Sequence, residues 1–136
     1  MPVHYTEDEY AYMSLLLKTI DSCDWQTLEH ILRTNPKKFV SVANVLARSA
    51  ELNGMTILHA CIRFDPPPKI VQMIIRLIPL APRAVDCLNR TPLHIAAGLR
   101  VNTQSIKNLI IACRDACAIQ DADGKTPLHL ACDVNW

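Results

Sequence analysis

The chain has few glycines, few aromatic residues and almost no net charge. Only three of its 136 residues are glycine, and 5% are aromatic. A loop that cradles phosphate needs several closely spaced glycines, so this composition excludes one. Half of the residues are apolar. With so few aromatic rings, leucine, isoleucine, valine and alanine must fill the core of a single domain.

Charge and patterning exclude several broad classes. The formal net charge is +1, with no long run of either sign, which argues against a nucleic-acid partner. The start of the chain lacks the basic and apolar pattern of a secretory signal. The most apolar run, 70–82, is too short to span a membrane and contains Arg76. Without a signal, the six cysteines favour a reducing compartment, so we expect an intracellular protein, cytoplasmic or nuclear.

A short motif recurs at a fixed step of 35 residues. Thr91-Pro92-Leu93-His94 returns as Thr126-Pro127-Leu128-His129, and Thr56-Ile57-Leu58-His59 precedes both with one substitution. Such a period is typical of stacked repeats, which usually bind rather than catalyse.

The same step relates apolar stripes with helical spacing. They comprise Val71, Ile74, Ile75 and Ile78, and then Ile106, Leu109, Ile110 and Cys113. Both follow i, i+3, i+4, i+7, and Leu28, Ile31 and Leu32 show the same stripe. Each unit therefore reads as helix, short loop, helix, long loop. Pro36 follows its stripe as Pro79 follows the second. The first long loop holds about eight extra residues, which we place within 39–50 as one or two helical turns.

The ends of the first helix in each unit carry local signals. Thr56, Thr91 and Thr126 are expected to cap it, and Pro92 and Pro127 suit the first helical position. Turn residues precede each threonine, in 51–55, 86–90 and 121–125. We expect these segments to project as fingers; the Asn-Gly of 51–55 and the Asp-Gly of 121–125 favour tight turns with positive φ.

On these motifs the chain resembles an ankyrin repeat protein, over roughly residue 21 to the C-terminus. The resemblance implies an all-α solenoid of stacked helix-turn-helix units with projecting turns. We divide the single domain, 1–136, into a degenerate capping unit with an insertion (6–50), repeats 51–85 and 86–120, and a partial repeat 121–136. The step of 35 exceeds the usual 33, with the excess placed between the two helices.

The two ends of the array differ. Thr6 and Glu9 form a capping-box pattern for a helix that runs to about Ile20, and Asp24 is a plausible cap for the next helix. The fourth unit lacks a second helix, and its first helix keeps an apolar face. We therefore expect the sequence to be part of a longer array.

The motif histidines and the cysteines are expected to be structural. Stacked repeats lie about 10 Å apart, whereas zinc holds nitrogens at about 2 Å, so His59, His94 and His129 cannot share one ion. The resemblance implies that each imidazole bonds to the neighbouring turn and to the threonine three residues earlier. Cys113 and Cys117 lack further ligands at zinc spacing, so we expect no metal and no cofactor. We find no arrangement of a catalytic nucleophile, and Asp121 and Asp123 occupy turn positions.

These observations predict a non-catalytic module that binds a partner protein on the concave face formed by the fingers and the first helices. We expect no nucleic acid, membrane or small-molecule substrate. The candidate contacts do not repeat from unit to unit; they are Asn53, Arg63, Phe64, Leu88, Arg90, Leu99, Arg100, Asp123 and Lys125. Packing of Phe64 and Leu99 against the next repeat is the open alternative. The alternative function is a targeting or substrate-recruiting segment of a larger enzyme.

Overall fold

The computed structural model describes residues 6–47 and 54–132, and the fold over these ranges is all-α, as predicted. Its α-helices are α1 (Glu7–Asp21), α2 (Trp25–Thr34), α3 (Pro36–Ala47), α4 (Ile57–Ile62), α5 (Pro68–Leu77), α6 (Pro92–Leu99), α7 (Thr103–Ala112) and α8 (Pro127–Ala131). Two 3₁₀ turns, η2 (Ala81–Arg83) and η3 (Arg114–Ala118), follow α5 and α7. Within these ranges no helix combines the length and apolar character needed to span a bilayer.

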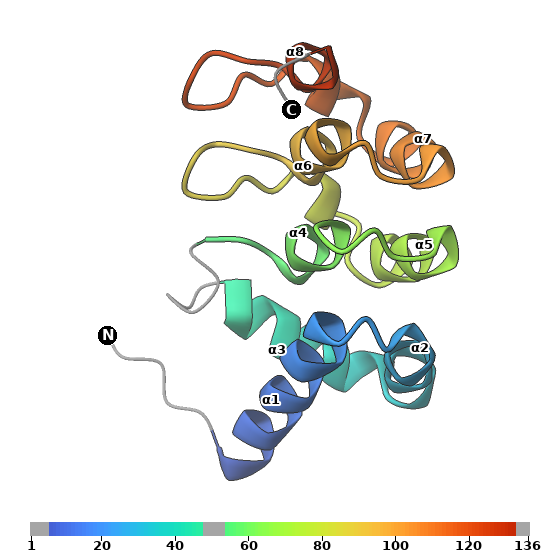
Figure 1. Cartoon of the computed structure of the whole chain (residues 1–136). Helices are drawn as coiled ribbons and strands as arrows, with labels where there is room; N and C mark the ends of the chain where they lie inside the picture. The colour runs from blue at the N-terminus through green and yellow to red at the C-terminus, as the bar shows by residue number, and fades with distance from the viewer. Residues whose placement is uncertain (1–5, 48–53, 133–136) are drawn as a thin grey trace.

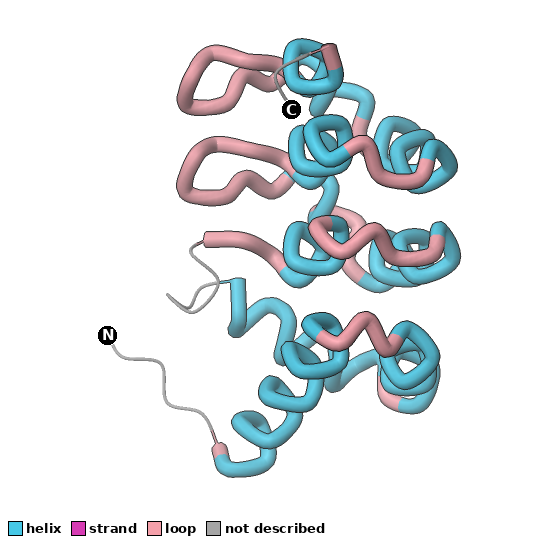
Figure 2. Tube along the Cα trace, in the orientation of Figure 1, coloured by secondary structure: helices cyan, strands magenta, loops and turns pink. Residues whose placement is uncertain are grey.

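The helices stack as layers of antiparallel pairs (Figure 1). Helices α4, α6 and α8 lie one above another, and α5 and α7 form a second column beside them. The loops that precede α6 and α8 project on the side away from α5 and α7 (Figure 2). This arrangement is the predicted solenoid with fingers.

The threonine–histidine motif starts each first helix in the same way. Thr56 is the N-cap of α4: its hydroxyl accepts from the His59 N–H at 3.3 Å, and its own N–H donates to His59 Nδ1 at 3.1 Å. Thr91 and Thr126 repeat this reciprocal capping box before α6 and α8. Pro92 and Pro127 occupy the first helical turn, where a missing N–H leaves no bond unmade. The predicted helix starts are therefore confirmed.

The apolar stripes form one continuous core. Leu28, Ile31 and Leu32 of α2 are buried, as are Val71 and Ile74 of α5. Ile75 and Ile78 are half-buried against the same core. Small residues at the centre of α6, Ala96 and Ala97, are buried where neighbouring first helices pack. The periodicity thus identified the packing face of each second helix.

The caps of the first unit are also as expected, with a small shift at one end. The Thr6 hydroxyl accepts from the Glu9 N–H at 3.1 Å, and Asp24 Oδ1 accepts from the Thr27 N–H at 3.2 Å. Helix α1 ends at Asp21, one residue beyond the predicted end.

The insertion differs from the prediction of one or two turns within 39–50. Helix α3 begins at Pro36 and has 12 residues, which is about three turns. Asn35 Oδ1 accepts from the Lys38 N–H at 3.2 Å, and the proline starts the helix instead of ending the previous one. The buried face of α3 comprises Phe39, Val42, Ala43 and Leu46, with helical i, i+3, i+4, i+7 spacing.

Helix α3 takes the place that η2 and η3 take in later units, directly after the second helix of the pair. It packs against α1, α2 and α4 and so lies between the first layer and the next (Figure 1). The prediction treated Pro36 and Pro79 as equivalent and therefore missed the helix that begins at Pro36. Pro79 instead lies in a turn.

The motif leucine differs in exposure between units. The motif leucine is 0% exposed in α4 and 3% exposed in α6, but Leu128 of α8 is 70% exposed. Among the described residues, α6 follows α4 and α8 follows α6, and the motif leucines of α4 and α6 are buried. The same residue type is therefore buried or exposed according to its place in the stack.

Candidate partner-binding groove

The fingers 86–90 and 121–125 are each shaped by one aspartate that accepts two backbone hydrogen bonds. Asp86 Oδ1 accepts from the N–H groups of Leu88 and Arg90, both at 2.9 Å. Asp121, 35 residues later, accepts at 2.9 Å from the N–H groups of Asp123 and Lys125. A carboxylate that closes its own turn in this way holds the finger in one conformation.

The finger tips use the left-handed backbone conformation, as predicted from the turn residues. Asn89 has φ 59° and Gly124 has φ 76°, at equivalent positions in the two fingers. Gly54 has φ 80° at the position 35 residues before Asn89. Asparagine and glycine adopt this conformation at lower cost than other residues.

Successive fingers are bonded to each other. The Ala122 N–H donates to the Leu88 carbonyl at 2.8 Å, and Asn89 Nδ2 donates to the Gln120 carbonyl at 2.7 Å. These bonds join finger 86–90 to finger 121–125 as neighbouring strips of backbone. The fingers therefore form one continuous wall.

The motif histidines tie each finger to the helix of the preceding unit. His59 Nε2 lies 2.8 Å from the Arg90 carbonyl, and His94 Nε2 lies 3.0 Å from the Lys125 carbonyl. Since Nδ1 accepts a backbone N–H from threonine, the proton of the neutral imidazole must be on Nε2, which donates to the carbonyl. The structural role that the resemblance implied for these histidines is present at both positions.

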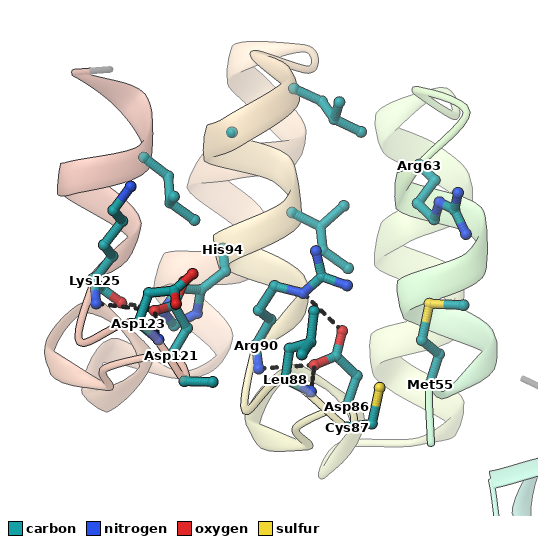
Figure 3. Close-up of a pocket in the computed structure, with 15 residues that line it drawn as sticks. Met55, Arg63, Asp86, Cys87, Leu88, Arg90, His94, Asp121, Asp123 and Lys125 are labelled. Carbon is teal, nitrogen blue, oxygen red and sulfur yellow. Dashed lines mark hydrogen bonds and ion pairs between the residues drawn. The ribbon is translucent and has the colours of Figure 1, made fainter. Parts of the chain in front are cut away.

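A groove of about 620 Å³ runs between the fingers and helices α4, α6 and α8 (Figure 3). Six of the nine predicted contact residues line it: Arg63, Leu88, Arg90, Leu99, Asp123 and Lys125. Leu88 is 48% exposed and Leu99 is 50% exposed, so each offers apolar surface to a ligand. That these residues contact a partner stays a prediction.

The other three predicted residues do not line the groove. Phe64, 40% exposed, and Arg100 lie at the loop ends of α4 and α6. Asn53 lies outside the described residues. Phe64 and Leu99 are equivalent by the 35-residue step, yet only Leu99 is a lining residue, since the groove is centred on the third unit.

Sequence reasoning missed part of the lining. Met55, Cys87, Ile95 and Leu130 also contribute. One signal was present: Met55 precedes Arg90 by 35 residues, and Arg90 precedes Lys125 by 35. The position before the capping threonine therefore faces the groove in three successive units.

One buried ion pair lies in the groove. Asp86 is 6% exposed, and its Oδ2 accepts from Arg90 Nε at 2.9 Å. Burial by itself raises the pKa of Asp86. The N–H groups of Arg90 and Leu88 and the Arg90 charge together outweigh burial, so the pKa lies below its usual value of 3.8. Asp86 is therefore ionised, and its carboxylate is bound by the backbone and the guanidinium of its own finger.

Two of the six cysteines, Cys61 and Cys113, are buried, and the other four are exposed. Within the described ranges, no group of three histidine, cysteine, aspartate or glutamate side chains is placed to hold a metal ion. Burial raises the pKa of the Cys61 thiol to about 12, so it behaves as a small apolar side chain. Cys117 lies in η3, beyond the end of α7, as expected from its position.

Comparison with known proteins supports the architecture. A family model described as ankyrin repeats (3 copies) matches residues 58–135. No curated protein matches the chain. The matched region contains α4 to α8 and both bonded fingers, and hence most of the groove.

Proposed function

The chain belongs to the ankyrin repeat family, whose arrays are in general protein–protein interaction modules, and we propose that it binds a partner protein in the groove between the fingers and helices α4, α6 and α8. In this proposal the array is non-catalytic. Specificity comes from the side chains that differ between units, since the shared motif residues of α4 and α6 are used in caps, in the core and in the inter-unit bonds of His59 and His94.

The observation that carries this proposal is exposed apolar surface within a wall that is already ordered. Leu88 and Leu99 each expose about half of their side chain in the groove. The wall is held by Asp86, Asp121 and the bonds between fingers. Binding would then cost little conformational entropy in this surface, which favours affinity at a given contact area.

Affinity capture with matched variants tests the proposal. Leu99→Glu places a charge in the groove, whereas Leu80→Glu places one on a leucine that is 70% exposed and does not line it. We expect proteins captured by the wild type to be retained by Leu80→Glu and lost with Leu99→Glu. Circular dichroism spectra of both variants check that the fold is intact.

The opposite result rejects the groove. If every captured protein binds Leu99→Glu as well as the wild type, the binding surface is elsewhere. If a folded wild-type chain captures no protein at all, the interaction function itself is wrong.

A further inference from the structure

The charged residues of the groove are arranged unevenly along the array. At one end, Arg63 caps the C-terminus of α4 and is exposed. Within the described residues, its guanidinium has no carboxylate at ion-pair distance. This end of the groove therefore presents an uncompensated cation.

The middle of the groove is neutral. Asp86 and Arg90 form their ion pair there and cancel each other. Leu88 lies beside them on the same finger, and Leu99 at the end of α6 also lines the groove. The two half-exposed leucines give this region an apolar surface.

The other end is acidic. Finger 121–125 brings Asp121, Asp123 and Lys125 to the groove, which gives one net negative charge. The Lys125 side chain extends along α8 and away from the Asp123 carboxylate (Figure 3). The groove as a whole is therefore neutral but dipolar, with its positive end at Arg63 and its negative end at Asp123.

We propose that the groove binds an extended segment with an acidic residue facing Arg63, a large apolar side chain over Leu99, and a basic residue facing Asp121 and Asp123. This inference rests on the proposed function and defines the chemistry of its partner. Complementary charges would set the direction in which the segment lies, and the apolar side chain would supply most of the affinity.

The repeat geometry predicts the spacing of these three residues. Arg63 and Asp123 belong to units two steps apart, and packed helices lie about 10 Å from each other, so the two ends are separated by about 20 Å along the direction of stacking. An extended chain advances about 3.3 Å per residue. The acidic and basic residues should therefore be about six positions apart, with the apolar residue between them.

Selection from a random dodecapeptide display library tests the pattern. The wild-type protein is the target, and peptides that still bind Leu99→Glu are discarded so that only groove ligands remain. We expect these ligands to share an acidic residue and a basic residue about six positions apart, with a large apolar residue between. The acidic residue can come before or after the basic residue in the peptide, because the charges at the two ends of the groove then set the direction in which each peptide lies.

Charge reversal then tests which residue each end faces. Arg63→Glu should weaken a selected peptide about tenfold, and changing the peptide's acidic residue to lysine should restore binding to this variant. Arg83→Glu, an exposed arginine on η2 that does not line the groove, should change affinity by less than about twofold. Asp123→Lys should show the converse preference at the basic residue of the peptide.

The outcomes separate this inference from the proposed function. Groove-dependent peptides with another charge pattern, or without rescue by charge reversal, overturn the dipolar segment but leave groove binding in place. If no selected peptide depends on Leu99, the dipolar segment is also rejected, and protein capture alone then decides the proposed function.

Discussion

Replacing His59 with alanine should cost far more stability than the same change at His129. His59 is 0% exposed and makes two side-chain bonds that alanine cannot: it accepts from the Thr56 N–H at 3.1 Å and bonds the Arg90 carbonyl at 2.8 Å. Each bond is worth about 1 kcal/mol, and an unpaired buried group adds about 1–3 kcal/mol. We expect a loss of about 3 kcal/mol for His59→Ala.

His129→Ala is the matched control within the same chain. His129 makes the same cap with Thr126, whose N–H lies 3.1 Å from its Nδ1, but the side chain is exposed and water can replace it. The expected loss is below about 1 kcal/mol. Urea unfolding followed by circular dichroism measures both variants against the wild type. Equal losses at the two positions would refute the assignment of an inter-unit role to His59.

The same residue should make stability depend on pH. Burial, the largest effect, lowers the pKa of His59 below its usual 6.5, although its bond to the Arg90 carbonyl and the Asp86 charge oppose this. The unfolded chain then binds a proton that the folded chain excludes. The contribution is fully present above about pH 6.5 and is lost as the pH falls through the folded pKa. We expect the wild type to lose stability between about pH 7.5 and about pH 5.5, and His59→Ala to lose less over this window.

Three further predictions test the insertion, a helix end and the thiols. Phe39→Ala should destabilise the protein by about 3–5 kcal/mol in urea unfolding, because the ring, near the start of α3, is 0% exposed; a loss below about 1 kcal/mol would place it outside the core. Cys23→Gly should raise the melting temperature, since Cys23 has φ 57°, by an amount equivalent to about 0.5–1 kcal/mol. Asp65→Gly should not raise the melting temperature, although Asp65 has φ 51°, because its carboxylate accepts the Asn102 N–H at 2.9 Å. A higher melting temperature for Asp65→Gly, or an unchanged one for Cys23→Gly, would contradict this explanation. Alkylation of the native protein followed by mass spectrometry should modify the exposed Cys87 and spare the buried Cys61, and labelling of Cys61 at the same rate would show that the α4 layer opens.

Much of the fold was predictable because each unit repeats the same local signals. The capping threonines, the prolines after Thr91 and Thr126 and the stripes of the second helices act within one or two turns of chain. Their outcome depends little on distant residues. The left-handed positions at Gly54 and Gly124 followed in the same way from Asn-Gly and Asp-Gly, and Asn89 takes the equivalent position in the finger between them.

The insertion was predicted less well, for a physical reason. Proline both ends one helix and suits the first turn of the next, and Pro36 does the second with Asn35 as its cap. The distinction depends on whether the following residues find a surface to bury. Phe39 and Leu46 do so between the first and second layers, which no local pattern specifies.

The groove was only partly predictable. Reasoning from non-repeating positions found Leu88, Leu99 and the charged residues, but it also included Phe64 and Arg100, which do not line the groove. Exposure depends on how adjacent layers overlap. Equivalent residues of successive units therefore need not share a surface.

The sequence alone determined the all-α repeat, the helix starts and the capping role of the motif, because those properties come from short-range spacing and capping. Tertiary structure decided which equivalent side chains are covered, as the contrast between Leu58 at 0% and Leu128 at 70% exposure shows. It also decided which charges compensate one another: Asp86 pairs with Arg90, whereas Arg63 lines the groove with no carboxylate at ion-pair distance among residues 6–47 and 54–132. Stacking brings residues one or two units apart to one surface, and charge and burial there depend on neighbours that sequence proximity does not reveal.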